Sequence, residues 1–280
     1  MFLSLLRIDI GGDPERPRPG RSWLRNLYRV HQRLCMGFPS RSRREEDPLF
    51  LAPFKPEDFP ELNCLADQPP SMIERRVLES IHAPRNSERG FLFRIEQAQG
   101  TSVPILVQSA IRPEWDYAFH NAAHFLAAPP QIRPFEPQFR QNQRLRFRLL
   151  ANPVRKVSRK SLTARGEAFD EAWIGKDVPV PETELRTWLE RRVEPNWRAA
   201  KNSEDKQSRP GFRVVDVTAI QTGYVYVTKN DEASAGRRRR SARYDGVLEV
   251  TDVACFLNTL VKGIGPGKAF GFGLLSVAPV

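Results

Sequence analysis

A tyrosine and a histidine three residues apart, Tyr28 and His31, are the side chains of this chain best suited to proton transfer. Residues at that spacing on a helix are neighbours. Imidazole has an unperturbed pKa of ~6.5, so it can act as either general acid or general base near neutral pH. The alternative is a His–Tyr pair packed on Leu24 and Leu27 at the border of the core. Spacing alone favours that structural explanation.

Metal and covalent chemistry have little support in the sequence. Of the four histidines, His120 and His124 have helical i,i+4 spacing, but no nearby acid or cysteine completes a ligand set. The three cysteines are far apart and lack metal-ligand spacing, which indicates reduced thiols. No serine or cysteine has the flanking residues of a recognisable nucleophile. We therefore predict no metal and no cofactor.

A glycine-rich stretch near the end of the chain carries the second chemical signal. Five of the 17 glycines fall within it: Gly263, Gly265, Gly267, Gly271 and Gly273. Such clustering predicts backbone with positive φ or close approach by another group. Lys268 adds positive charge, so free N–H groups at Gly265 and Gly267 would suit a phosphate. Ala269 stands where a Walker loop needs serine or threonine. A plain connecting loop would explain only the first one or two glycines.

The net charge of +11 over 280 residues indicates a polyanionic partner, nucleic acid before an anionic membrane surface. Residues 144–165 contain eight Lys or Arg and no acid, and the alternating arginines around Phe147 would put their charge on one strand face. The run Arg237–Arg240 is either a solvated face or further binding surface. RNA supplies its own 2′-hydroxyl nucleophile, so one acid–base pair and positive charge at the phosphate would suffice to cleave it.

These residues must be positioned by a mixed α+β fold. Hydrophobic periodicity predicts strands over 2–10, 89–96, 103–109, 143–150, 212–220, 223–228, 242–250 and 274–277. Helices are expected over 22–36 with Ser22 as N-cap, over 113–125, from Pro181 to about Val193, and from Thr251 to Val261. The proline-rich 129–137 is expected to be a crossing and the run 237–240 a loop.

This order repeats β-α-β-β-α-β and predicts two ferredoxin-like (RRM-like) domains in tandem. We place them at 1–152, with the helix that bears Tyr28 and His31, and at 153–280, with the glycine-rich stretch. Residues 39–88 are rich in Pro, Arg and Glu and are expected to form a flexible insertion. No run of ~18 to 20 apolar residues predicts a membrane span, and the apolar start is typical of a strand rather than a signal peptide. We expect a cytoplasmic protein.

Four segments occur in an order that resembles the CasE family, the repeat-processing endoribonucleases of type I-E CRISPR systems. They are Leu27–Leu34 (LYRVHQRL), Gly90–Ile95 (GFLFRI), Leu145–Pro153 (LRFRLLANP) and Gly263–Pro279 (GIGPGKAFGFGLLSVAP). The last is the most specific. The resemblance covers nearly the whole chain outside 39–88, which has no recognised counterpart.

The resemblance implies metal-independent cleavage of precursor CRISPR RNA at the 3′ base of each repeat hairpin, leaving a 2′,3′-cyclic phosphate. The family's catalytic pair falls on Tyr28 and His31. The protein would keep the mature crRNA and remain with the other subunits of Cascade, with no membrane partner. We infer that the residues after Pro153 hold the hairpin stem: Arg155, Lys156, Arg159 and Lys160. The alternatives are a non-catalytic RNA-binding subunit of a CRISPR ribonucleoprotein and a basic RNA-modifying or ribosome-associated factor.

Overall fold

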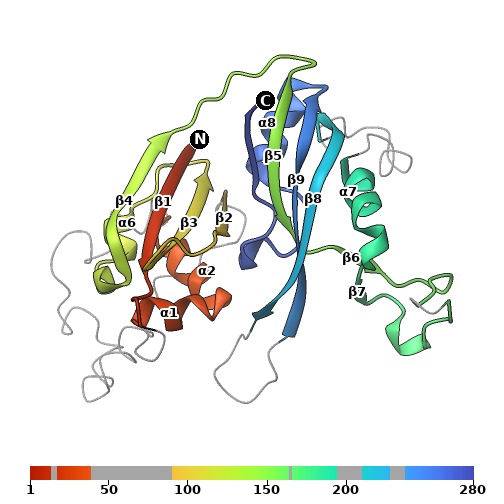
Figure 1. The fold of residues 1–280 in the computed structure, drawn as a ribbon, viewed down its shortest axis with the longest axis horizontal. Coiled ribbons are helices and arrows are strands. Elements are labelled where there is room, and N and C mark those ends of the chain that lie inside the picture. The colour runs from red at the N-terminus through yellow and green to blue at the C-terminus, as the bar shows by residue number, and fades with distance from the viewer. Residues whose placement is uncertain (14–17, 39–89, 164–165, 194–209, 228–236) are drawn as a thin grey trace, which may run out of the picture.

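The computed structural model describes residues 1–13, 18–38, 90–163, 166–193, 210–227 and 237–280, which build two four-stranded antiparallel sheets (Figure 1). The expected insertion at 39–88 lies outside these residues. The first sheet and its helices comprise β1 (Phe2–Asp9), α1 (Pro19–Leu24), α2 (Leu27–Met36), β2 (Phe91–Ile95), β3 (Ser102–Ser109), α6 (Trp115–Ala118), the 3-10 turn η3 (Ala123–Phe125) and β4 (Leu126–Pro134).

The second half of the chain carries the other sheet and one small two-stranded ribbon. Its elements are β5 (Arg144–Ala151), β6 (Val154–Lys156), η4 (Glu171–Trp173), β7 (Asp177–Pro179), η5 (Glu182–Glu184), α7 (Leu185–Val193), β8 (Phe212–Val227), β9 (Arg237–Val250), α8 (Val253–Lys262), η7 (Lys268–Phe270) and β10 (Leu275–Pro279). Strands β6 and β7 pair with each other between β5 and α7.

Both sheets have the ferredoxin-like strand order. The first runs β2-β3-β1-β4 and the second β10-β5-β9-β8, so each half places its first and third strands in the middle. Every pair in the two sheets is antiparallel. The predicted tandem of ferredoxin-like units is therefore confirmed.

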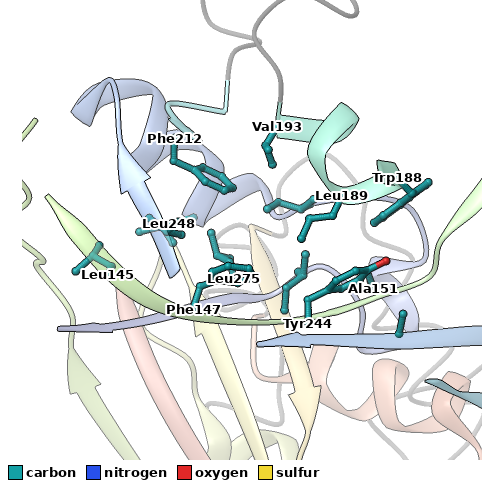
Figure 2. Close-up of a cluster of buried hydrophobic side chains, with 14 of the residues drawn as sticks. Leu145, Phe147, Ala151, Trp188, Leu189, Val193, Phe212, Tyr244, Leu248 and Leu275 are labelled. Atoms are coloured by element: carbon teal, nitrogen blue, oxygen red, sulfur yellow. The ribbon is translucent and has the colours of Figure 1, made fainter. Parts of the chain in front are cut away.

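Helices cover one face of each sheet because each presents an apolar stripe to it. In the first unit Val30 and Leu34 of α2 join Leu6 and Ile8 of β1 in one buried cluster. In the second, α7 packs its apolar side chains onto the sheet, as Figure 2 shows. These side chains are Leu185, Trp188, Leu189 and Val193, the face predicted from the sequence.

The strand expected to close the first sheet belongs to the second. Residues 144–151 pair with β9 and β10, and the first sheet is closed by β4, where the prolines predict a crossing. Proline cannot donate to a sheet ladder, so it is tolerated mainly at an edge. β4 is an edge strand, paired only with β1, and can accommodate Pro129, Pro130 and Pro134. From this pairing we propose that the domain boundary lies within 135–143, which crosses from β4 to β5 in Figure 1.

Four further expectations were wrong in their boundaries or in the type of element. The helix expected over 22–36 is two helices, and the one expected over 113–125 is the short α6 followed by η3. The two strands expected over 212–228 form one long strand, β8, with irregularities on both sides of Val217. The run Arg237–Arg240 is the start of β9 rather than a loop, because it pairs with residues 224–227 of β8. None of the described helices is long and apolar enough to cross a membrane.

The buried Tyr244 gives a test of the second core. Its hydroxyl donates to the Leu185 carbonyl at 3.1 Å, and burial raises the pKa of the phenol above its ordinary value, with Arg240 opposing the shift. Tyr244→Phe should lower the free energy of unfolding by about 1 kcal/mol near neutral pH. Because the raised pKa belongs to the folded state, the wild type should lose stability as pH rises above ~10, where the unfolded tyrosine ionises.

Thermal melts of both proteins between about pH 8 and about pH 11 measure this difference. The gap between wild type and Tyr244→Phe should narrow as pH rises. A gap that stays constant across the range would contradict the assignment of the alkaline loss to Tyr244.

Candidate active site

The helix that bears Tyr28 and His31 begins after the N-cap Asn26, not after the predicted N-cap Ser22. The Asn26 side chain accepts from the backbone N–H groups of Tyr28 and Arg29 at 3.1 and 3.3 Å. Asparagine is a favoured N-cap, because its side chain satisfies N–H groups that have no partner inside the helix. The cap separates α1 from α2 and leaves Tyr28 in the first turn of α2. His31 follows one turn later on the same side.

The imidazole of His31 packs against aromatic side chains of β2. Its ring is nearly parallel to those of Phe91 and Phe93 on β2, with centroid distances of 5.6 and 6.3 Å. Phe38 in turn stacks on Phe91, at a centroid distance of 4.7 Å. His31 Nε2 is 3.5 Å from the sulfur of Cys35, one turn along α2. The plane of the histidine ring is therefore set by its packing, and both Tyr28 and His31 are half-buried at a border with solvent.

The glycine-rich stretch reaches these aromatic side chains from the second unit. All five of its glycines have φ between 69° and 90°, as their clustering predicted. A Cβ on Gly263 would lie 2.7 Å from Leu92 Cδ1, and one on Gly271 would lie 3.2 Å from the Phe93 ring. The turn η7 within this stretch contacts both α2 and β2. Phe93 therefore packs against His31 and against the glycine-rich backbone.

Two buried polar side chains beside this contact form hydrogen bonds between the two units. Arg94 on β2 is 4% exposed and forms an ion pair with Glu96 at 2.6 Å. It also donates to the carbonyl of Leu274 and the hydroxyl of Ser276 at 3.3 and 3.0 Å. Burial lowers the pKa of Arg94, while the nearby Glu96 opposes that shift. Gln108 on β3 donates to the Leu260 carbonyl of α8 at 2.5 Å.

The predicted phosphate-binding residues of the stretch have distinct surroundings. A Cβ on Gly265 would lie 3.2 Å from Trp188, and one on Gly267 would lie 2.9 Å from Phe272. Both glycines thus have packing reasons for their identity, and their contact with RNA stays a prediction. Lys268 is exposed at the start of η7. Partial burial of its ammonium, and secondarily the positive charge of Lys262, lower the pKa of Lys268.

The basic segment after Pro153 lies apart from α2. In Figure 1 the β6–β7 ribbon is on the side of the second unit away from the first. Lys156, Arg159 and Lys160 are exposed there. Arg155 is half-buried and holds the segment in shape, donating to the Leu162 carbonyl at 2.6 Å and lying 3.7 Å from Glu184.

The arginines of β5 do not form the free basic face that their alternation suggested. They do share one exposed face, but Arg148 lies 2.6 Å from Asp245 and Arg144 lies 3.5 Å from Glu249, both on β9. Phe147 points into the opposite face and is 4% exposed in the core. Cross-strand acids, which periodicity within one strand cannot show, neutralise much of this charge.

Within the described ranges, no group of three or more His, Cys, Asp or Glu could hold a metal ion. His120 and His124 are both exposed, and the ring of His124 packs on Phe125. Three residues that surround His31 were not predicted from the sequence: Phe91, Phe93 and Cys35. The alternation of Phe91 and Phe93 was an available signal, since residues two apart on a strand share a face.

Comparisons with known proteins agree with this architecture. A family model described as CRISPR associated protein matches residues 73–279. The CRISPR-associated endoribonuclease Cse3 of Thermus thermophilus is 35% identical over 198 residues, covering 67% of this chain and 79% of that protein. The chain belongs to the CasE family. A further CasE relative, the Cascade subunit CasE of Escherichia coli K12, is 25% identical over 265 residues, 93% of this chain and 96% of that protein.

Solved structures of CasE-family proteins match over the full length. CRISPR endoribonuclease Cse3 bound to a 19-nucleotide RNA has a TM-score of 0.60 and 28% identity, with 100% of both chains covered. Thermus thermophilus Cse3 bound to an RNA that represents a pre-cleavage complex has a TM-score of 0.59 and 26% identity, also covering both chains fully. The CasE-family fold thus extends over both units described above.

Docking of the glycine-rich stretch can be tested by comparing two glycines with positive φ. Gly263→Ala places a methyl against Leu92 and the Gly273 carbonyl, whereas nothing lies within 4 Å of a Cβ on Gly175. Both substitutions carry backbone strain, of about 1–3 kcal/mol. Urea unfolding should therefore show a larger loss of stability for Gly263→Ala, by about 1–3 kcal/mol beyond that of the Gly175→Ala control. Equal losses would mean that the stretch does not dock tightly on β2.

Proposed function

We propose that this chain is the endoribonuclease that processes precursor CRISPR RNA, cutting at the 3′ base of the repeat hairpin with Tyr28 and His31. The observation that carries this proposal is the meeting of α2 with the glycine-rich stretch over Phe93. It supports the proposal because it brings the helix of Tyr28 and His31 into contact with η7, the turn that begins at Lys268. The relatives' names and their RNA-bound structures support the activity.

The chemistry needs no group beyond the chain and the RNA. A base removes the proton of the 2′-hydroxyl, whose oxygen then attacks the adjacent phosphorus. The P–O5′ bond breaks, the 2′,3′-cyclic phosphate forms, and an acid returns a proton to the leaving 5′-oxygen. His31 acts as the acid or base, and Tyr28 orients the 2′-hydroxyl or assists the proton transfer. The aromatic packing of His31 restricts its ring, which reduces the ordering needed when the RNA binds.

The basic surface of the β6–β7 ribbon would hold the hairpin stem. An A-form duplex hides its base edges in a narrow major groove, so contacts to phosphates and to helix shape dominate there. Lys156, Arg159 and Lys160 are exposed and suited to such contacts, while Arg155 shapes the segment that displays them. Because the ribbon lies away from α2, a stem seated on it would extend from the cut site across the second unit.

After cleavage the protein would retain the mature crRNA and serve as a subunit of Cascade. The name of the Escherichia coli relative supports this assignment. Precursor CRISPR RNA is transcribed in the cell, so we place the protein in the cytoplasm. We propose no metal and no cofactor for the reaction.

Cleavage of a labelled repeat hairpin in EDTA tests the proposed function. Wild type should cut once, and His31→Ala should be slower by about 10²- to 10⁴-fold, because the proton transfer loses its imidazole. His124→Ala, which removes an exposed histidine away from the site, should cut like wild type. A substrate with 2′-deoxy at the cut should bind without being cut. Binding of the normal substrate without cleavage would instead indicate a non-catalytic RNA-binding subunit.

The proposed stem-binding surface leads to a separate prediction about how RNA affinity depends on salt concentration. In the double variant Arg159→Gln with Lys160→Gln, the slope of log affinity against log salt should fall by about 1 for each phosphate that the protein no longer neutralises. The control pair Arg133→Gln with Arg140→Gln removes the same charge from exposed positions on β4 and the following linker. Filter binding with 2′-deoxy repeat RNA measures both. Equal slopes in the two double variants would exclude a specific role for the ribbon.

A further inference from the structure

The β8–β9 hairpin reaches the same site from a third direction. Arg239 of β9 pairs with Val225 of β8, and β8 contacts α2. The guanidinium carbon of Arg239 lies over the ring of Phe270, 5.0 Å from its centroid. Phe270 ends η7, the turn that contacts α2 and β2. A chain of contacts therefore connects Arg239 to the helix of Tyr28 and His31.

Arg238, Arg239 and Arg240 differ in the interactions that they already make within the protein. Arg240 is committed to the fold, since it donates to the Val180 carbonyl at 3.0 Å and pairs with Glu182 at 2.6 Å. Arg238 lies over the ring of Tyr224, at 4.0 Å. None of the ion pairs among the described residues includes Arg239, and its buried Nε has no hydrogen-bond partner. Arg239 is therefore held in place by the Phe270 ring and has an N–H donor available for a ligand.

We infer that Arg239 binds the scissile phosphate and stabilises the negative charge that grows on it during cleavage. This assignment rests on the proposed function. A guanidinium presents a planar fork of N–H donors that fits two phosphate oxygens. Its partial burial strengthens the attraction relative to a cation in bulk water. The Phe270 ring fixes the guanidinium before the RNA arrives, so little reorganisation is needed during the reaction.

Lys268 is the competing cation, and the structure assigns it a different part. It is exposed at the beginning of η7, next to the like charge of Lys262, and no aromatic ring holds it among the described residues. An ammonium is a point charge without a fixed fork of donors, so Lys268 suits attraction of the RNA backbone more than alignment of one phosphate. Lys268→Ala should therefore weaken RNA binding more than it slows the bound complex.

The test separates the chemical step from binding. Single-turnover cleavage is measured with saturating protein, and affinity is measured with the uncleavable 2′-deoxy repeat. Arg239→Ala should slow cleavage by about 10²- to 10³-fold, the effect of losing one preorganised donor to a developing charge. Its affinity should change no more than about threefold, a small part of the effect on rate. Arg186→Ala, which removes an exposed arginine on α7, should leave both quantities unchanged.

Two companion measurements distinguish direct phosphate contact from a structural role. Arg239→Lys should recover part of the rate, because the charge remains although the fork is removed. Free guanidinium added to Arg239→Ala should restore cleavage in a saturable manner, which a packing defect would not allow. Should Arg239→Ala fail to fold, Arg239→Gln, which keeps much of the side-chain length, takes its place in the same assays.

Cleavage by Arg239→Ala at the wild-type rate would overturn the inference. So would a loss of affinity as large as the loss of rate, because Arg239 would then only hold the RNA. These results differ from failure of the proposed function itself, in which wild type binds the repeat and does not cut it.

Discussion

The candidate active site depends on the packing of glycine backbone against one strand, β2. Three consecutive residues of β2, Leu92, Phe93 and Arg94, are buried, so both faces of this edge strand are covered. Phe93 packs toward the first core and His31, while Leu92 and Arg94 meet the second unit. Only glycine permits that approach at Gly263, where any Cβ would overlap Leu92. The contact joins the two units and forms one wall of the site.

Arg94 gives this contact its orientation. A buried ion pair is weak evidence for added stability, because removing both charges from water costs nearly as much as their attraction returns. The role of Arg94 here is to fix how the two units are aligned. The guanidinium satisfies the Glu96 carboxylate on its own strand and carbonyl and hydroxyl groups of the second unit in one arrangement. A slipped or rotated docking would leave buried donors without partners, which disfavours alternatives to the observed alignment.

Local sequence patterns predicted the features that depend on residues close together in the sequence. The glycine cluster indicated positive φ, the spacing of Tyr28 and His31 indicated one helix, and the alternation over 144–148 indicated a strand with one charged face. Such patterns could not predict features that depend on residues distant in the sequence. Which sheet residues 144–151 join is decided by β9 and β10, and the neutralising acids of that charged face come from β9. The prolines of β4 argued against a strand, because a single sequence does not show that this segment lies at the edge of a sheet.

The position of the glycine-rich stretch between α8 and β10 has a consequence for the order in which the enzyme is made. The helix with Tyr28 and His31 leaves the ribosome early, whereas η7 and β10 come long after it. Until β10 is available, β5 has an open edge and the wall over Phe93 is missing. A chain that lacked these residues would therefore carry the proposed proton-transfer groups without the surface proposed to align RNA against them. On the proposed function, cleavage would thus begin only after β10 has been synthesised and has paired with β5.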